Sequence, residues 1–262
     1  MDREERIKKN KKKKKRKRVF KRITLFLVII FTLFFTLKYI GAFNVKNISV
    51  KGPGGIDSTE IIKKSGLNEG SYFFSQTKES REKNIMSIPD IKDVKISFSP
   101  FRNVTITVSK RNPKAQIKTG KKYFIVDSDF KIINESNKAK DNIVVITGLN
   151  TKGFSLGEFI LQKDSIYKEM LIKLFNSQDV YKYISKVEIG KNSFDFITKD
   201  EINIDMGSYK DLDYKFKMLD EILKDINETG KNVSSIEMEK GANPIVIMNS
   251  ESDNKKEDNN KN

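Results

Sequence analysis

The stretch ITLFLVIIFTLFFTL, residues 23–37, decides what kind of protein this chain forms. Twelve of its fifteen residues are apolar and three are Thr, and Arg22 and Lys38 bound it. Fifteen helical residues measure about 22 Å, less than the hydrocarbon core of about 30 Å. Apolar residues continue past Lys38 to Phe43, and flanking cations can extend to the interface. A buried core helix would normally carry a polar face, so we predict a transmembrane helix over residues 23–42.

The basic segment before this helix predicts its orientation. Residues 1–22 contain fourteen Lys or Arg and three acidic residues, a net charge of +11, out of +16 for the whole chain. Positive charge beside a membrane span stays on the cytoplasmic side, near anionic lipid. A nucleic-acid-binding run would interleave aromatics with its lysines, and a cleaved signal peptide would end in a small-residue site that residues 40–45 lack. We therefore predict a signal anchor with a cytoplasmic tail over residues 1–22.

The composition excludes several kinds of chemistry. The chain contains neither Cys nor His, which removes disulfides, thiolate nucleophiles, Ser-His-Asp triads and His-ligated zinc. Carboxylates such as Asp195, Asp200 and Glu201 could support a glycosidase or wall hydrolase, but they fall in predicted strand edges and turns. Asp127 and Asp129 form an Asp-x-Asp pair that could bind a metal, yet further ligands are missing nearby in the sequence. We predict no catalytic, cofactor-binding or metal-binding residue.

Residues 43–113 are predicted to form a small domain after the span. Alternating apolar residues predict strands, the run Asp57-Ser58-Thr59-Glu60 is typical of a helix start, and Pro89 ends a second helix. The order is therefore β-α-α-β-β, a small sheet with two helices on one face. The predicted elements are a strand over 43–51, helices over 57–66 and 77–87, and strands over 94–98 and 104–108.

The residues of this domain resemble the POTRA domain of the FtsQ/DivIB family of bacterial division proteins. The Arg-x-Pro-x-Ala run at the end of the third strand is the most specific part. Pro113 cannot donate to a ladder, so it ends the strand and redirects the chain. The resemblance rests on Gly66-Leu67-x-x-Gly70, Ile88-Pro89-x-Ile91-x-x-Val94-x-Ile96 and Val104-x-Ile106-x-Val108-x-x-Arg111-x-Pro113-x-Ala115.

The resemblance continues past a domain boundary near residues 113–119. Residues 123–133 look like the family's hairpin, in which Asp127 and Asp129 bracket a tight turn. We expect a second domain over residues 114–248, a mixed and mainly antiparallel sheet with packed helices, so that the chain is α+β overall. The polar tail, residues 249–262, is predicted to be disordered. The predicted helices cover 163–177 and 212–230, and the strands cover 144–147, 184–189, 194–198, 201–206, 233–238 and 244–248.

The resemblance also implies a function. It indicates a non-enzymatic protein in the cell membrane that binds FtsL-like and DivIC- or FtsB-like single-span proteins at the septum and regulates peptidoglycan synthesis. A membrane-anchored envelope enzyme and a POTRA-type translocation factor are the alternatives. A partner strand can add to an open sheet edge, and the family's last strands carry partner binding. By position these correspond to Ser235, Ile236, Glu237, Met238, Glu239, Lys240, Ile245, Val246 and Ile247.

The predicted topology can be tested with reporter fusions. Alkaline phosphatase fused after Phe43 is expected to be active, and a cytoplasmic reporter at the same position silent, because the basic segment holds the N-terminus inside. The reverse pattern, or a mature N-terminus near Asn44, would contradict an uncleaved anchor.

Overall fold

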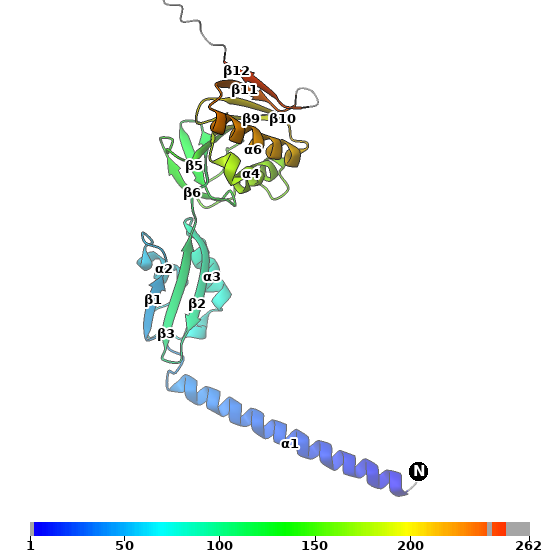
Figure 1. Ribbon diagram of the computed structural model, residues 1–262. Coiled ribbons are helices and arrows are strands. Elements are labelled where there is room, and N and C mark those ends of the chain that lie inside the picture. Colours follow the sequence, from blue (N-terminus) through cyan, green and yellow to red (C-terminus); the bar gives the residue numbers. More distant parts are fainter. Residues whose placement is uncertain (1–2, 240–242, 250–262) are drawn as a thin grey trace, which may run out of the picture. The chain divides into compact units, whose positions relative to one another are not determined.

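The computed structural model describes residues 3–239 and 243–249 (Figure 1). The chain divides into two compact units. The first comprises residues up to 87 together with 93–110, and the second comprises residues 88–92 together with the chain from 111 onward. The predicted boundaries of the two domains, 43–113 and 114–248, remain our proposal. The predicted disordered tail lies outside the described residues apart from Asn249.

The basic segment and the apolar stretch share one continuous helix, α1 (Arg3–Tyr39). This helix is, within the described residues, the single candidate for a membrane span, which covers residues 15–39. It ends three residues before the predicted end at 42, since the chain turns there and Gly41 adopts a φ of 69°. The hydroxyls of Thr24, Thr32 and Thr36 donate to carbonyls four residues earlier, so these groups are satisfied within the helix.

The first unit has the predicted β-α-α-β-β order, with a short 3₁₀ turn, Phe73–Ser75, between its helices. The strands lie in the order β1-β3-β2, and β1 is parallel to β3. The Asp57 carboxylate caps the first helix by accepting from the Thr59 N–H at 2.8 Å, as the sequence pattern indicates. The elements are β1 (Asn47–Lys51), α2 (Ser58–Ser65), α3 (Lys78–Met86), β2 (Ile91–Phe98) and β3 (Asn103–Lys110).

A buried arginine in α3 ties the helices of the first unit together. The Arg81 guanidinium donates to the carbonyls of Ser65 at 2.7 Å and Phe73 at 3.1 Å, and to the Ser75 hydroxyl at 2.9 Å. Burial lowers the pKa of Arg81 from its ordinary value. These bonds satisfy carbonyls at the end of α2 and in the 3₁₀ turn, which would otherwise be unpaired in the interior.

The second unit is built on one nine-stranded sheet in the order β12-β11-β10-β9-β8-β7-β4-β5-β6. Three neighbouring pairs, β4–β7, β7–β8 and β10–β11, are parallel and the rest antiparallel, which confirms the predicted mixed, mainly antiparallel sheet. The strands are β4 (Ala115–Thr119), β5 (Lys122–Val126), β6 (Ile132–Ser136), β7 (Val144–Thr147), β8 (Ile184–Ile189), β9 (Ser193–Thr198), β10 (Asn203–Ser208), β11 (Val233–Glu237) and β12 (Ile245–Met248).

Three helices, α4 (Ile166–Asn176), α5 (Gln178–Tyr181) and α6 (Leu212–Thr229), contribute buried side chains to the core of this unit. Helices α4 and α6 lie beside the sheet in Figure 1. The predicted apolar stripe on α6 is buried as expected at Leu212, Phe216, Leu219 and Leu223, while Ile226 is partly buried. β4 was not expected, because its residues lie where the sequence suggested a boundary.

The Asp-x-Asp pair after β5 binds a guanidinium. Arg111 is buried, and its Nη1 donates to the carboxylates of Asp127 and Asp129 while its Nε donates to the Ile91 carbonyl at 3.0 Å. The second oxygen of Asp127 accepts from the N–H groups of Asp129 and Lys131, each at 3.0 Å. The predicted hairpin turn is thus present, and both of its carboxylates accept hydrogen bonds from Arg111.

A close approach of two chain segments explains why glycine follows β7. Gly148 adopts a φ of 90°, and a Cβ placed there would lie 1.9 Å from the carbonyl oxygen of Ile189, at the end of β8. A left-handed conformation costs an L-residue about 1–2 kcal/mol, and the clash is with backbone that cannot rotate away.

We therefore expect Gly148→Ala to lower the free energy of unfolding by more than about 2 kcal/mol, from strain and overpacking together. Gly153 is the matched control, since its φ is 83° but nothing lies within 4 Å of its Cβ position. Urea unfolding of the detergent-solubilised chain should show a loss of about 1–2 kcal/mol for Gly153→Ala, from the left-handed conformation alone. Equal losses in the two variants would contradict the clash.

Candidate binding edge

The strand that the sequence placed last is also last in the sheet. Among the described residues β12 pairs with β11 on one side, and no strand lies on its other side. The sequence left open whether residues 244–248 lie at a sheet edge, and the strand order places β12, residues 245–248, there. An edge strand presents backbone donors and acceptors to which another strand can bond.

The register shows which backbone groups of β12 face outward. The Met238 N–H donates to the Asp205 carbonyl of β10 at 2.8 Å. Backbone groups alternate along a strand, so Glu237 directs its N–H and C=O toward β12, where it pairs with Ile245. The next residue of β12, Val246, must then point its N–H and C=O away from β11.

The side chains of β12 are apolar and exposed. Ile245 is 44%, Val246 38%, Ile247 41% and Met248 49% exposed. Alternate residues of a strand point to opposite faces, so apolar surface lies on both sides of this edge. Four consecutive exposed apolar residues on an open strand are typical of a surface that another chain covers.

The predicted residues of β11 divide between core and surface. Ile236 and Met238 are buried, so their side chains contribute to the core, whereas Ser235 and Glu237 are half-buried. Beyond the strand Glu239 is exposed, and Lys240 lies outside the described residues.

The Glu239 carboxylate is held against the end of β10. It accepts from the hydroxyl and the N–H of Ser208, and the Lys215 ammonium lies 3.5 Å away. The bonds from Ser208 lower the pKa of Glu239 from its ordinary value. This contact anchors the chain where it leaves β11.

A row of carboxylates crosses the sheet next to this edge. Glu188 pairs with Asp195, Asp195 with Asp205, and Asp205 with Glu237, on the successive strands β8, β9, β10 and β11. Directly paired residues place their side chains on the same face, so the row ends beside Ile245 of β12. We call Glu188, Asp195, Asp205 and Glu237 the acidic row.

Like charges facing one another across a ladder destabilise a sheet. Glu188 is paired with Lys186 on its own strand. Burial, and then the carboxylates of Asp205 and Glu188, raise the pKa of Asp195. From the sequence, Asp195 was considered as a hydrolase carboxylate and assigned to a strand edge or turn; its opposing carboxylates became evident only from the register.

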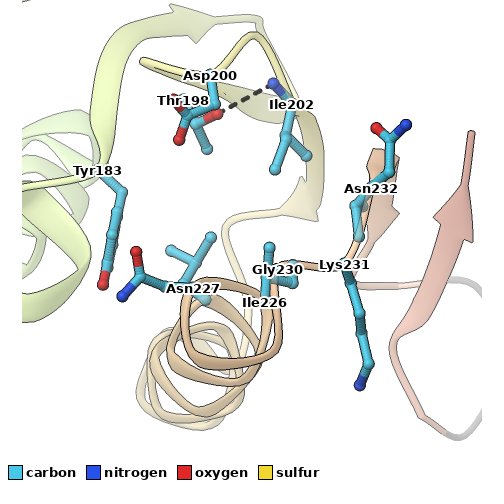
Figure 2. A pocket seen from close by; sticks show the side chains of 11 residues that line it. Tyr183, Thr198, Asp200, Ile202, Ile226, Asn227, Gly230, Lys231 and Asn232 are labelled. Atoms are coloured by element: carbon cyan, nitrogen blue, oxygen red, sulfur yellow. Dashed lines mark hydrogen bonds between the residues drawn. The ribbon is translucent and has the colours of Figure 1, made fainter.

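A pocket of about 290 Å³ lies between the end of α6, the β9–β10 turn and the start of β11 (Figure 2). The Ile202 N–H donates to the Thr198 hydroxyl at 3.0 Å on one wall. On another wall Asn232 accepts from the Asn249 N–H at 2.9 Å, which holds the end of β12. Asp200 is its one carboxylate, so the pocket offers no carboxylate pair for hydrolysis.

Three comparisons place the chain among known proteins. The FtsQ-type POTRA domain family matches residues 43–111. The cell division protein DivIB of Clostridium tetani is 27% identical over 211 residues, which are 79% of this chain and 80% of that protein. DivIB of Clostridium acetobutylicum is 32% identical over 116 residues, 44% of this chain and 47% of that protein.

A solved structure of the major extracytoplasmic domain of the trans isomer of DivIB from Geobacillus stearothermophilus matches 41% of this chain and 86% of that domain. Its sequence identity is 9% and its TM-score 0.28. A similarity at that level carries no weight for the fold, which we describe from this chain alone.

We expect Asp195→Asn to raise the free energy of unfolding by about 0.2–1 kcal/mol at neutral pH, because it removes like-charge contacts. The pKa of Asp195 is raised on folding, so the penalty is present above the folded pKa and disappears as the carboxyl protonates in acid. The stability advantage of the Asp195→Asn variant over the wild type should therefore vanish at low pH. Asp200→Asn, at an exposed turn carboxylate, is the control and should change little. Urea unfolding at two pH values measures both, and an unchanged or less stable Asp195→Asn variant would contradict the repulsion.

Proposed function

Because this chain belongs to the FtsQ/DivIB family of cell division proteins, we propose that it acts as a non-enzymatic, membrane-anchored division protein. It binds FtsL-like and DivIC- or FtsB-like single-span proteins at the septum and thereby regulates septal peptidoglycan synthesis. The observation that carries the proposal is the open outer side of β12, with its apolar side chains and outward backbone groups.

The anchoring part of this proposal rests on α1. One helix long and apolar enough to span a membrane, preceded by a strongly basic segment, supports a single-pass protein with a cytoplasmic N-terminus. The POTRA-type unit and the nine-stranded unit then lie on the outer side of the membrane, where septal peptidoglycan is made.

The binding step is strand addition. A partner segment in extended conformation accepts from the outward N–H of Val246 and donates to its carbonyl, and its side chains cover the exposed Ile245 and Ile247. The acidic row ends beside Ile245, so a partner strand with basic residues on that face is favoured over an acidic one.

The carboxylates of the sheet support binding over catalysis. Asp195 and Asp205 face one another on adjacent strands, and neither lines the pocket of Figure 2. A hydrolase places its two carboxylates across a substrate cleft, which this ladder arrangement does not provide.

Proline substitution in β12 separates binding from folding. Val246→Pro removes an N–H that points away from β11, so the ladder between β11 and β12 keeps its bonds while the outer edge loses a donor. We expect this variant to remain folded by circular dichroism and to lose most partner retention when the full chain is purified in detergent from dividing cells. Immunoblots for the FtsL-like and DivIC-like proteins measure the loss.

Two further chains control this experiment. Ile247→Pro removes an inward N–H, since Ile247 pairs with Ser235, and should destabilise the hairpin as well as binding. A chain ending after Ser250 should retain partners fully, because the edge is complete without the tail. If the wild type and a folded Val246→Pro variant retain the partner proteins equally, the binding surface lies elsewhere than on β12.

A further inference from the structure

Aromatic rings, two of them exposed and two half-buried, gather at the end of the first unit where the chain leaves α1. We call Phe43, Tyr72, Phe74 and Phe101 the aromatic collar. Phe74 is 54% and Phe101 80% exposed. The Phe74 ring lies 5.5 Å from that of Phe43 and 5.8 Å from that of Tyr72, so three of the four form one cluster.

Backbone hydrogen bonds hold both collar loops to the segment that follows the span. Phe73 donates to the Phe43 carbonyl at 3.0 Å, and Lys46 donates to the Arg102 carbonyl at 2.7 Å. The first bond fixes the loop that carries Tyr72 and Phe74, and the second fixes the turn between β2 and β3 that carries Phe101. Neither loop can leave this segment unless these bonds break.

The chain length keeps the collar near the membrane. The span ends at Tyr39, and four residues cover at most about 14 Å before Phe43. An amphipathic helix that lies at a membrane interface buries its apolar face about 5–10 Å into the boundary between headgroups and acyl chains, and aromatic rings are enriched at the same level. A collar tethered this closely to the end of a span is within reach of that layer.

We propose that the aromatic collar inserts into the bilayer interface and seats the first unit on the membrane surface. Tyr and Phe rings are favoured at this depth because their apolar bodies leave water. Lys46 is exposed beside the collar and Lys38 precedes it on α1, and both place positive charge at the level of anionic phosphates. The occupant is therefore lipid, and this inference is independent of which protein covers β12.

The chain contains no Trp, so a single introduced Trp reports its own depth. We would reconstitute the full chain carrying Phe74→Trp or Phe101→Trp into vesicles of phosphatidylethanolamine and phosphatidylglycerol. The acyl chains are brominated near the headgroup in one set of vesicles and unbrominated in the other. Both variants are expected to lose most of their fluorescence in the brominated vesicles, as interfacial rings contact the bromine quencher.

Gly54→Trp is the matched control within the same unit. Its Cβ would have nothing within 4 Å, and it follows the far end of β1, about 13 Å along the strand from Asn47. It should keep its fluorescence in both sets of vesicles. The proposal is overturned if either Phe74→Trp or Phe101→Trp is quenched no more than Gly54→Trp, which is also the result expected if a protein covers the collar. Tyr72→Trp replaces Phe74→Trp if circular dichroism shows that the latter is unfolded.

Discussion

The second unit depends on the buried ion pair between Arg111 and Asp127. The two groups are almost inaccessible to water, and a buried charge that loses its partner destabilises a protein by about 3–5 kcal/mol. Asp127 also accepts backbone N–H groups from its own turn, while Arg111 lies four residues before β4. The pair therefore fixes how the chain enters the sheet relative to β5, the antiparallel neighbour of β4. The contact thereby supports the antiparallel pairing of β4 with β5.

The open edge at the other side follows from the connections between strands. β10 and β11 are parallel, so the chain must cross over between them, and α6 makes that crossing while covering the buried face. β12 then returns antiparallel to β11, and no described element follows to cover it. The placement of the edge at the end of the chain is thus a product of topology. The acidic row depends on the same strand order, because it forms only when β8, β9, β10 and β11 lie side by side in register.

Elements with one buried face could be predicted from sequence, and elements outside that pattern could not. The stripe on α6 and the alternation in β3 show a single period that reports one apolar face. β4 has no such alternation, since Ala115, Gln116 and Ile117 are all buried. Gln116 reads as a surface residue in sequence, but its amide binds the Lys140 and Ile143 carbonyls. The candidate binding edge was proposed from family resemblance and strand order, whereas the outward direction of Val246 required the observed register.

The exposed apolar edge that makes β12 a candidate binding surface also leaves an unassembled copy of the protein open to edge-to-edge pairing. Edge strands are usually blunted by charge, proline or a bulge, whereas β12 is apolar throughout and Pro244 precedes it. An open apolar edge can also pair with the same edge of a second copy, a contact that would exclude the partner strand that we propose. Under the proposed function, the number of copies that a cell makes would then have to match the supply of partner strands. Excess copies would then be lost to self-association, and fewer assemblies of the proposed kind would form.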